Sequence, residues 1–339
     1  MTPIPIEPIF IPDADPSDRW SCAKDAVCRI TCPGSTVCDE YEETLYARLL
    51  RFEALIDLAW EEGMQHTPSA MDSLLRDTIH ETIQMLDDGI ISVAAINPLR
   101  ADARHNWAVN WWIKRALIIY DRLVPNRMLG DSLESKSVMD PGRTFYWDNR
   151  HLKFSNWTET QFEAAKIIIA PPAIAQKGCF IGPKSIHKGI RIEMGAYVSS
   201  DVFIDDGAMV GSCAHIGMGV QISKNATVGG AMRPVELVPA VIEDRAFIGS
   251  FSKVSAGVLV SSEAILVGSV DLERETPIID EIRGEVYRGY VPPRALVVTK
   301  RHAQSGLNLP HIVYYRRDEE SRYAARDILN TFYRNVRIE

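Results

Sequence analysis

The sequence predicts a mainly β protein whose central part is a parallel β-helix, with an α-helical domain before it and a short cap of strands and a helix after it. The first observation behind this prediction is an apolar residue at every sixth position. A helix cannot keep a strict period of six on one face, and an ordinary strand alternates by two. A coil wound as a prism repeats with each side of the prism, so a period of six indicates a β-helix. The repeated positions are Ile174, Phe180, Ile186, Ile192, Val198, Ile204, Val210, Ile216, Ile222, Val228, Ile242, Ile248, Val254, Val260 and Leu266.

The second observation is a small residue two positions before many of these apolar residues, which suits the tight corners of a coil. Fifteen hexads, at three per turn, predict about five turns over residues 171–270. Val228 and Ile242 are 14 residues apart, so eight residues interrupt the repeat. The glycines and prolines in this stretch are typical of a loop that leaves the coil. The small residues are Ala196, Ala208, Ala214, Ala226, Ala240, Ala246, Ser252 and Ala264.

The third observation is helical periodicity in the N-terminal domain, residues 41–170. Apolar spacing predicts helices over about 41–63, 69–89 and 106–123. Ser69 suits the N-cap of the second helix, and Gly89 suits its end. The aromatic residues of the third helix are expected to pack into a core.

Residues 1–40 form a Cys-containing extension without a clear period, which is expected to be loosely ordered. Its cysteines are spaced C-x5-C-x3-C-x5-C, wider than the usual C-x2–4-C of zinc sites. Free thiols are the favoured interpretation, with a metal site or two disulfides as alternatives, and no metal is expected. These cysteines are Cys22, Cys28, Cys32 and Cys38.

Residues 271–339 are expected to hold C-terminal strands and a helix. The repeat ends after Leu266, and the following segment VGSVDLERETPIIDEIRGEVYRGYVPP predicts a hairpin-like pair of short strands. The last apolar pattern, over 318–335, predicts a terminal helix that caps the coil.

Charge and composition exclude several classes of function. With 37 basic and 45 acidic residues, the chain has a formal net charge of −8, so its overall field does not favour nucleic acid. The chain has no apolar run long enough to cross a bilayer, and its first residues lack the basic and apolar parts of a secretory signal. We therefore expect a cytoplasmic protein with no membrane partner. An anionic ligand needs a local basic cluster.

Several motifs resemble those of the tetrahydrodipicolinate N-succinyltransferases of lysine biosynthesis. They are GAYVSSDVFIDDGAMVGSCAHIG, VGGAMRPVELVPAVIEDRAFIGS and GEVYRGYVPPRALVV, together with IHETIQMLDDGIISVA and WWIKRALIIYD in the helical domain. The resemblance covers roughly residues 41–335. It implies a left-handed β-helix and a homotrimer with active sites between subunits. It also implies an acyl-CoA donor (succinyl-CoA or acetyl-CoA) and a small-molecule amine acceptor.

The resemblance also implies which residues bind the acceptor. In FIDDGAMVGSC, Asp205 stands where the family has an acceptor-binding aspartate, and it is the predicted catalytic residue. In FIGSFSKV, Lys253 stands where the family has a carboxylate, and in IIIAPP, Ile168 stands where it has an arginine. Exchanging these charges alters which acceptor fits. We therefore expect an acceptor other than tetrahydrodipicolinate.

Other residues compete for roles in the chemistry. Acyl transfer to an amine needs a proton acceptor, and His215 is the rival base because of its near-neutral pKa. Cys213 is expected to be a small buried residue rather than a nucleophile. Glu243 is expected to make a structural hydrogen bond. The candidate CoA-binding group, needed because CoA carries phosphates, consists of Arg288, Arg294, Lys300 and Arg301.

The sequence therefore predicts a CoA-dependent N-acyltransferase that moves a succinyl or acetyl group to an amino-acid-like acceptor by direct attack. One alternative is a genuine 2,3,4,5-tetrahydropyridine-2,6-dicarboxylate N-succinyltransferase. Another is a non-catalytic trimeric scaffold, because fold does not fix function. A zinc lyase of the γ-carbonic anhydrase kind needs three histidines on its coil, and residues 171–270 contain only His187 and His215.

Overall fold

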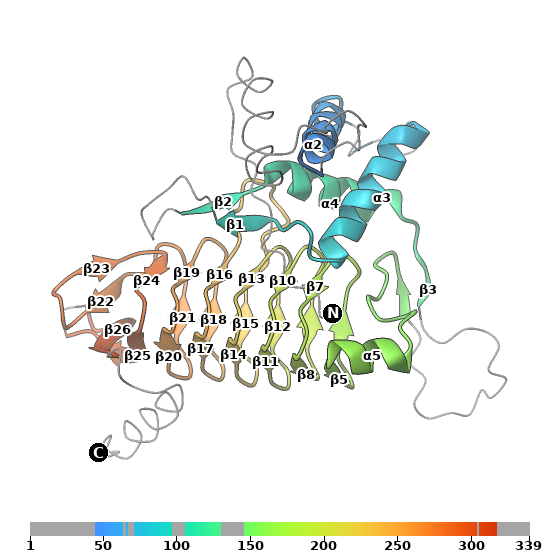
Figure 1. Ribbon diagram of the computed structural model, residues 1–339. Helices are drawn as coiled ribbons and strands as arrows, with labels where there is room; N and C mark the ends of the chain where they lie inside the picture. Colours follow the sequence, from blue (N-terminus) through green and yellow to red (C-terminus); the bar gives the residue numbers. More distant parts are fainter. Residues whose placement is uncertain are drawn as a thin grey trace, which may run out of the picture.

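The computed structural model describes residues 45–63, 66, 71–96, 106–129, 146–303 and 305–316. They form the predicted class, a left-handed parallel β-helix with an N-terminal helical domain and a C-terminal group of strands. In Figure 1 the coil runs across the picture with the helices of the N-terminal domain above it. The Cys-containing extension and the expected terminal helix at 318–335 lie outside the described residues.

Three parallel sheets form the sides of the coil, and the chain visits them in the order sheet I, sheet II, sheet III. Sheet I contains β5 (Ile168–Ala170), β8 (Ile186–Lys188), β11 (Phe203–Ile204), β14 (Gln221–Ile222), β17 (Phe247–Ile248) and β20 (Ile265–Leu266). Sheet II contains β6 (Ile174–Ala175), β9 (Arg191–Ile192), β12 (Met209–Val210), β15 (Thr227–Val228), β18 (Lys253–Val254) and β21 (Asp271–Leu272). Sheet III contains β7 (Phe180–Ile181), β10 (Tyr197–Val198), β13 (His215–Ile216), β16 (Val241–Ile242), β19 (Leu259–Val260) and β24 (Tyr290–Val291).

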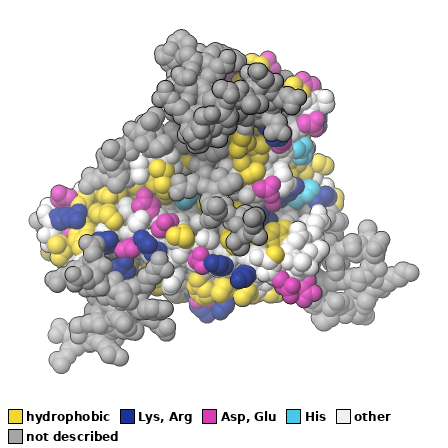
Figure 2. Space-filling view, in the orientation of Figure 1, with side chains coloured by type: hydrophobic (Ala, Val, Ile, Leu, Met, Phe, Trp, Pro, Cys, Tyr) yellow, Lys and Arg dark blue, Asp and Glu magenta, His cyan; other side chains and the backbone are white. Residues whose placement is uncertain are grey.

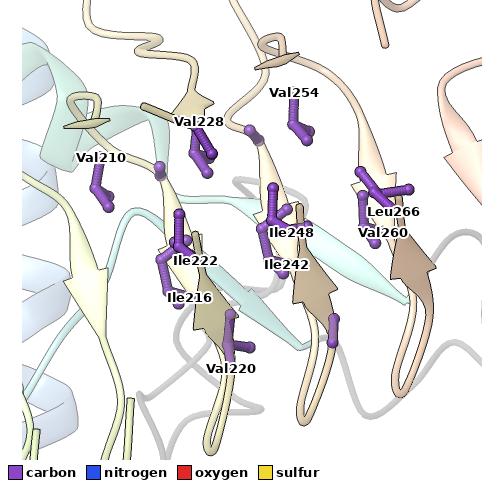
Figure 3. Close-up of a cluster of buried hydrophobic side chains, with 14 of the residues drawn as sticks. Val210, Ile216, Val220, Ile222, Val228, Ile242, Ile248, Val254, Val260 and Leu266 are labelled. Atoms are coloured by element: carbon purple, nitrogen blue, oxygen red, sulfur yellow. The ribbon is translucent and has the colours of Figure 1, made fainter. Parts of the chain in front are cut away.

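The aliphatic residues of the repeat point inward and stack along the coil axis (Figure 3). From Ile192 to Leu266 every predicted hexad position is fully buried. The small residues two positions earlier are also buried, as predicted for tight corners. Sheets II and III each have six strands, one turn more than predicted, because β21 and β24 extend the coil beyond Leu266.

The predicted phase is wrong for the first three hexads. Ile174, Phe180 and Ile186 are only partly buried, while the residue after each of them pairs with an inward residue of the next turn. His187, for example, pairs with Ile204 and is fully buried. The step from His187 to Ile192 has five residues instead of six, which shifts the register. Because the inward residue at this point is a histidine, the apolar pattern of the sequence does not reveal the shift.

The corners between the sheets depend on a residue in the left-handed backbone region. The third residue after most inward residues has a positive φ, whether it is Gly207, Asn225 or the bulky Phe251. Glycine and asparagine adopt this conformation readily, whereas a phenylalanine there is strained. The same backbone turn therefore recurs at these corners, although the side chains differ.

The helical domain contains α2 (Leu45–Glu61), α3 (Ser73–Asp87) and α4 (Trp111–Leu123), with a two-stranded sheet of β1 (Ala94–Ile96) and β2 (Trp107–Val109). The second helix begins at Ser73, where Asp72 caps it by accepting a hydrogen bond from the Leu75 N–H, and not at the predicted Ser69 cap. The predicted third helix begins only at Trp111, because the residues before it pair as β2.

The helical domain packs directly against the coil at the corner between sheets II and III. A Cβ at Gly195 would lie 2.7 Å from Leu117 of α4, so only glycine allows this approach. Met194 and Cys213 of the coil belong to the same buried cluster as α4. The inserted loop at 229–240 folds back on this helix, where the Lys114 ammonium donates to the Val235 and Leu237 carbonyls.

The remaining strands lie at the two ends of the coil. A hairpin of β3 (Arg127–Leu129) and β4 (Tyr146–Asp148), followed by α5 (Glu159–Ala165), lies at its start. At the other end β22 (Ile278–Asp280) and β23 (Val286–Tyr287) form the predicted antiparallel pair. There β25 (Ala295–Arg301) and β26 (Asn308–Tyr315) continue sheet I.

Candidate functional site

Asp205 lies at the corner between sheets I and II, directly after β11. Its N–H donates to the Ile222 carbonyl, which fixes its backbone in the coil, and its side chain is half-buried. The neighbouring Asp206 is exposed and pairs with Lys224 at 3.5 Å. Asp205 is therefore the carboxylate of this pair that has no ion pair among the described residues, which leaves it accessible to a ligand.

Lys253 lies on the outer face of sheet II and is already paired. Its ammonium lies 2.8 Å from a Glu273 oxygen and 3.8 Å from an Asp271 oxygen. The hydrogen bond to Glu273 raises the pKa of Lys253. An acceptor carboxylate would have to compete with these two side chains for the ammonium.

Ile168 lies on the outer face of sheet I, in the first turn of the coil, with 56% of its surface exposed. The ladder runs from Ile168 through Ile186 to Phe203, so Asp205 lies two turns further along. Lys253 lies two turns beyond Asp205. Since neighbouring strands are about 4.8 Å apart, one subunit does not bring the three residues into one pocket.

His215 lies on the outer face of sheet III, covered by the helical domain. Its ring stacks on Tyr197 with centroids 4.8 Å apart and contacts Trp107 at 4.6 Å. Burial lowers the pKa of His215 to about 4, against the opposing effect of a hydrogen bond to the Ala94 backbone. This environment favours a packing role between β2 and the coil.

Glu243 makes the structural hydrogen bonds predicted for it. One carboxylate oxygen accepts from the Trp107 indole N–H at 2.8 Å, and the other accepts from the Ser262 N–H and hydroxyl. Glu243 therefore links the coil to the helical domain.

Cys213 and Cys179 are buried thiols. Burial raises the pKa of each to about 12, so neither forms a nucleophilic thiolate near neutral pH. This agrees with the prediction that Cys213 is a small buried residue.

The candidate CoA-binding residues differ in whether they form ion pairs within the described part of the chain. Arg294 lies 3.0 Å from Glu263, which also binds Arg245 and Arg316. Lys300 lies 2.9 Å from Glu281. Arg288 and Arg301 are exposed. Basic and acidic side chains lie side by side over this end of the coil, at the left of Figure 2. Sequence reasoning missed Arg245 and Arg316, because only the fold brings them to Glu263.

A cavity at the start of the coil was also missed. It has a volume of about 240 Å³ and lies between the β3–β4 hairpin and sheet II. Its lining includes Trp147, Asp148, Arg150, Ile174 and Arg191. No sequence signal links the hairpin residues to the coil, because the contact is tertiary.

Two classes of site receive no support from the described part of the chain. No group of three or more His, Cys, Asp or Glu side chains there is arranged to hold a metal ion. None of the helices placed by the structure is long and apolar enough to cross a membrane.

Comparison with known proteins identifies the family. Residues 51–123 match the family profile "Tetrahydrodipicolinate N-succinyltransferase N-terminal". A 2,3,4,5-tetrahydropyridine-2,6-dicarboxylate N-succinyltransferase of Polynucleobacter asymbioticus is 34% identical over 246 residues, covering 73% of this chain and 84% of that protein. Its counterpart in Paramagnetospirillum magneticum is 34% identical over 249 residues, covering 73% and 83%.

A crystal structure of a putative 2,3,4,5-tetrahydropyridine-2-carboxylate N-succinyltransferase from Campylobacter jejuni also matches. It has a TM-score of 0.36 and 12% identity, covering 70% of this chain and 62% of that one, which is too low to bear on function. The sequence similarity to the curated relatives is sufficient by itself: the chain belongs to the tetrahydrodipicolinate N-succinyltransferase family.

Proposed function

We propose that the chain is a CoA-dependent N-acyltransferase that transfers a succinyl group from succinyl-CoA to the amine of an amino-acid-like acceptor. The observation that carries this proposal is Asp205, an accessible carboxylate at a rigid corner of the coil, in a chain related to N-succinyltransferases. Succinyl-CoA is preferred to acetyl-CoA as the donor because the relatives are named as succinyltransferases.

The reaction is a direct transfer. The lone pair of the acceptor amine forms a C–N bond to the thioester carbonyl carbon, and the C–S bond breaks as the CoA thiolate leaves. Asp205 orients the amine and takes its proton, which then passes to the thiolate or to water. No covalent intermediate on the protein is needed, which is consistent with the high thiol pKa of Cys213.

We further propose that the active enzyme is a homotrimer. Two turns of the coil separate Ile168 from Asp205, and two more separate Asp205 from Lys253. A site that uses all three residues therefore draws them from more than one subunit. CoA phosphates would be held by Arg288 and Arg301, two exposed members of the predicted basic group that form no ion pair with another described residue.

The acceptor is proposed to differ from tetrahydrodipicolinate. Ile168 presents no charge, and Lys253 is held by Glu273 and Asp271. The alternative is the acceptor of the named relatives, 2,3,4,5-tetrahydropyridine-2,6-dicarboxylate, and the same assay distinguishes the two.

The experiment is a thiol-release assay with succinyl-CoA and acetyl-CoA against a panel of amines that includes tetrahydrodipicolinate. Asp205→Asn is expected to keep CoA binding and to lower turnover by about a hundredfold, a typical contribution of a positioned acid or base. Asp206→Asn is the matched control, since it removes the adjacent carboxylate, and is expected to keep turnover within about twofold. Normal turnover in Asp205→Asn would reject its catalytic role, and a protein that binds no CoA and acylates no amine would be a scaffold.

A further inference from the structure

The cavity at the start of the coil is lined by residues of the β3–β4 hairpin and of sheet II. Trp147 from β4 and Arg150 from the following turn face sheet II, where Ile174 and Arg191 are paired neighbours. Its volume of about 240 Å³ is below the roughly 300–1,000 Å³ of a typical ligand pocket, so it suits one end of a small molecule. Trp147 keeps 66% of its surface exposed, so it offers an aromatic face to a ligand.

Two arginines and one carboxylate, that of Asp148, give this cavity its chemical character. Arg191 donates through Nε to Glu193 at 3.2 Å, and 45% of its side chain stays exposed. Arg150 donates through Nε to Asp121, which also accepts from Arg233 at 2.9 Å. Asp121 therefore pairs with two guanidinium groups. Within the described part of the chain, the side-chain hydrogen bonds of Arg150 and Arg191 run through Nε. A guanidinium end of this kind matches a carboxylate in a bidentate manner.

The surroundings of the cavity are also positive. Burial lowers the pKa of His151, next to Arg150, and the nearby charges of Arg127 and Lys177 lower it further. This concentration of positive charge occurs in a chain whose formal net charge is −8. In the lining itself, Arg150 and Arg191 outnumber the single carboxylate of Asp148, so an anionic group is favoured here over a cationic one.

The cavity lies one turn of the coil from the Asp205 corner. Arg191 of β9 pairs with Met209 of β12, and β12 is the strand that follows the Asp205 corner. A Cβ at Gly189, just before Arg191, would lie 3.4 Å from an Asp206 carboxylate oxygen, so the two corners are in contact. Since adjacent strands are about 4.8 Å apart, a molecule that reaches both Asp205 and Arg191 must be longer than one such step.

We propose that this cavity binds the carboxylate end of the acceptor. Arg191 and Arg150 take the carboxylate, and Trp147 and Ile174 contact the apolar carbons. The substrate class is an amine that carries a carboxylate several bonds away on an apolar chain. This proposal rests on the proposed acyl transfer at Asp205 for its kinetic part, whereas the carboxylate site itself is tested by binding alone.

The binding test uses hexanoate, a carboxylate that cannot be acylated, titrated into the full-length protein by calorimetry. Arg191→Gln is expected to weaken hexanoate binding by about tenfold or more, the effect of losing a charge-assisted hydrogen bond. Arg191→Lys keeps the charge and is expected to lose less. Arg274→Gln is the matched control, because Arg274 is an exposed arginine near the opposite end of the coil, and it should bind hexanoate as the unmodified protein does. Unchanged binding in Arg191→Gln would overturn the site.

The kinetic test compares 6-aminohexanoate with hexylamine, which lacks the carboxylate, in the presence of succinyl-CoA. Arg191→Gln is expected to raise KM for 6-aminohexanoate by about tenfold with kcat within about twofold. The kinetic constants for hexylamine should not change. An equal effect on both amines would contradict carboxylate recognition. Arg191-dependent hexanoate binding in a protein that acylates no amine would support the site and overturn the proposed acyl transfer.

Discussion

Replacing His187 by leucine is expected to remove a pH-dependent loss of stability from the coil. His187 occupies an inward position between Ile169 and Ile204, where the rest of the column is aliphatic. Its side chain is fully buried, and neither ring nitrogen has a hydrogen-bond partner among the residues that the structure describes. Leucine fits this column without a polar group and without a proton to gain.

The magnitude follows from the pKa of His187, which burial lowers from its ordinary value of 6.5 to about 4. Below about pH 6.5 the unfolded chain binds a proton at this residue, and the folded chain binds it only near pH 4. The free energy of unfolding therefore falls as the pH falls between these two values. Each unit of pKa difference is worth about 1.4 kcal/mol, so the whole window costs about 3 kcal/mol, of which about 2 kcal/mol is lost by pH 5.

The assay is urea unfolding of the unmodified protein and His187→Leu at pH 7.5 and 5.0, at one fixed protein concentration because oligomers unfold in a concentration-dependent manner. The stability advantage of His187→Leu should grow by about 2 kcal/mol between the two pH values. Ile181→Leu, at the preceding inward position, is the control and should show the same difference at both pH values. An advantage of His187→Leu that does not change with pH would refute the reasoning.

Three further outcomes are expected from single features of the fold. Phe251 has a φ of 61° with 66% of its surface exposed, so Phe251→Asn should raise the free energy of unfolding by up to about 1 kcal/mol; a loss of stability would mean that the ring packs in a subunit interface. Lys114→Met leaves two carbonyls of the 229–240 loop without their donor. It should lower the free energy of unfolding by about 2 kcal/mol and speed hydrogen exchange in that loop. Unchanged exchange would show that Lys114 does not hold the loop. With the four extension cysteines replaced by serine, Cys179 and Cys213 should resist a thiol reagent at pH 8 because burial raises the pKa of both to about 12; labelling as fast as in denaturant would contradict this.

The coil could be predicted from the sequence because its interior admits few alternatives. The interior of the coil is narrow, so the inward position of each hexad admits only a side chain of similar size. From Ile192 onward an aliphatic residue fills each of these positions. The predicted phase of the hexads was wrong where a residue that is not aliphatic fills an inward position. His187 is buried like its neighbours but is invisible to an apolar pattern, and the five-residue step after it shifts the phase of the hexads before it.

The candidate site was less predictable, for two physical reasons. Asp205 resembles any other aspartate at a turn, and only the family motif distinguishes it from Asp206. The cavity residues Trp147 and Arg191 are far apart in the sequence and meet because a hairpin packs on the first turns of the coil. Periodicity reports which residues face the interior of an element, whereas a binding site depends on which outer faces are brought together.

The two faces that flank the corner of Asp205 differ in charge, and this difference bears on the choice of acceptor. On sheet I the exposed Ile168 stands where the family resemblance implies an arginine, so that side offers an apolar surface. On sheet II, one turn from Asp205, Arg191 and Arg150 line a cavity that an aromatic ring completes. An acceptor that bound its carboxylate on the sheet I side would therefore lose its partner in this chain, while one that extends toward sheet II would gain two. Under the proposed acyl transfer, the uncharged residue 168 and the arginines of the cavity are consistent with one change, a shift of carboxylate recognition from one side of the Asp205 corner to the other. That shift predicts that Ile168→Arg alone will not raise thiol release from succinyl-CoA with tetrahydrodipicolinate, because Lys253 still stands where a carboxylate is implied and remains paired with Glu273.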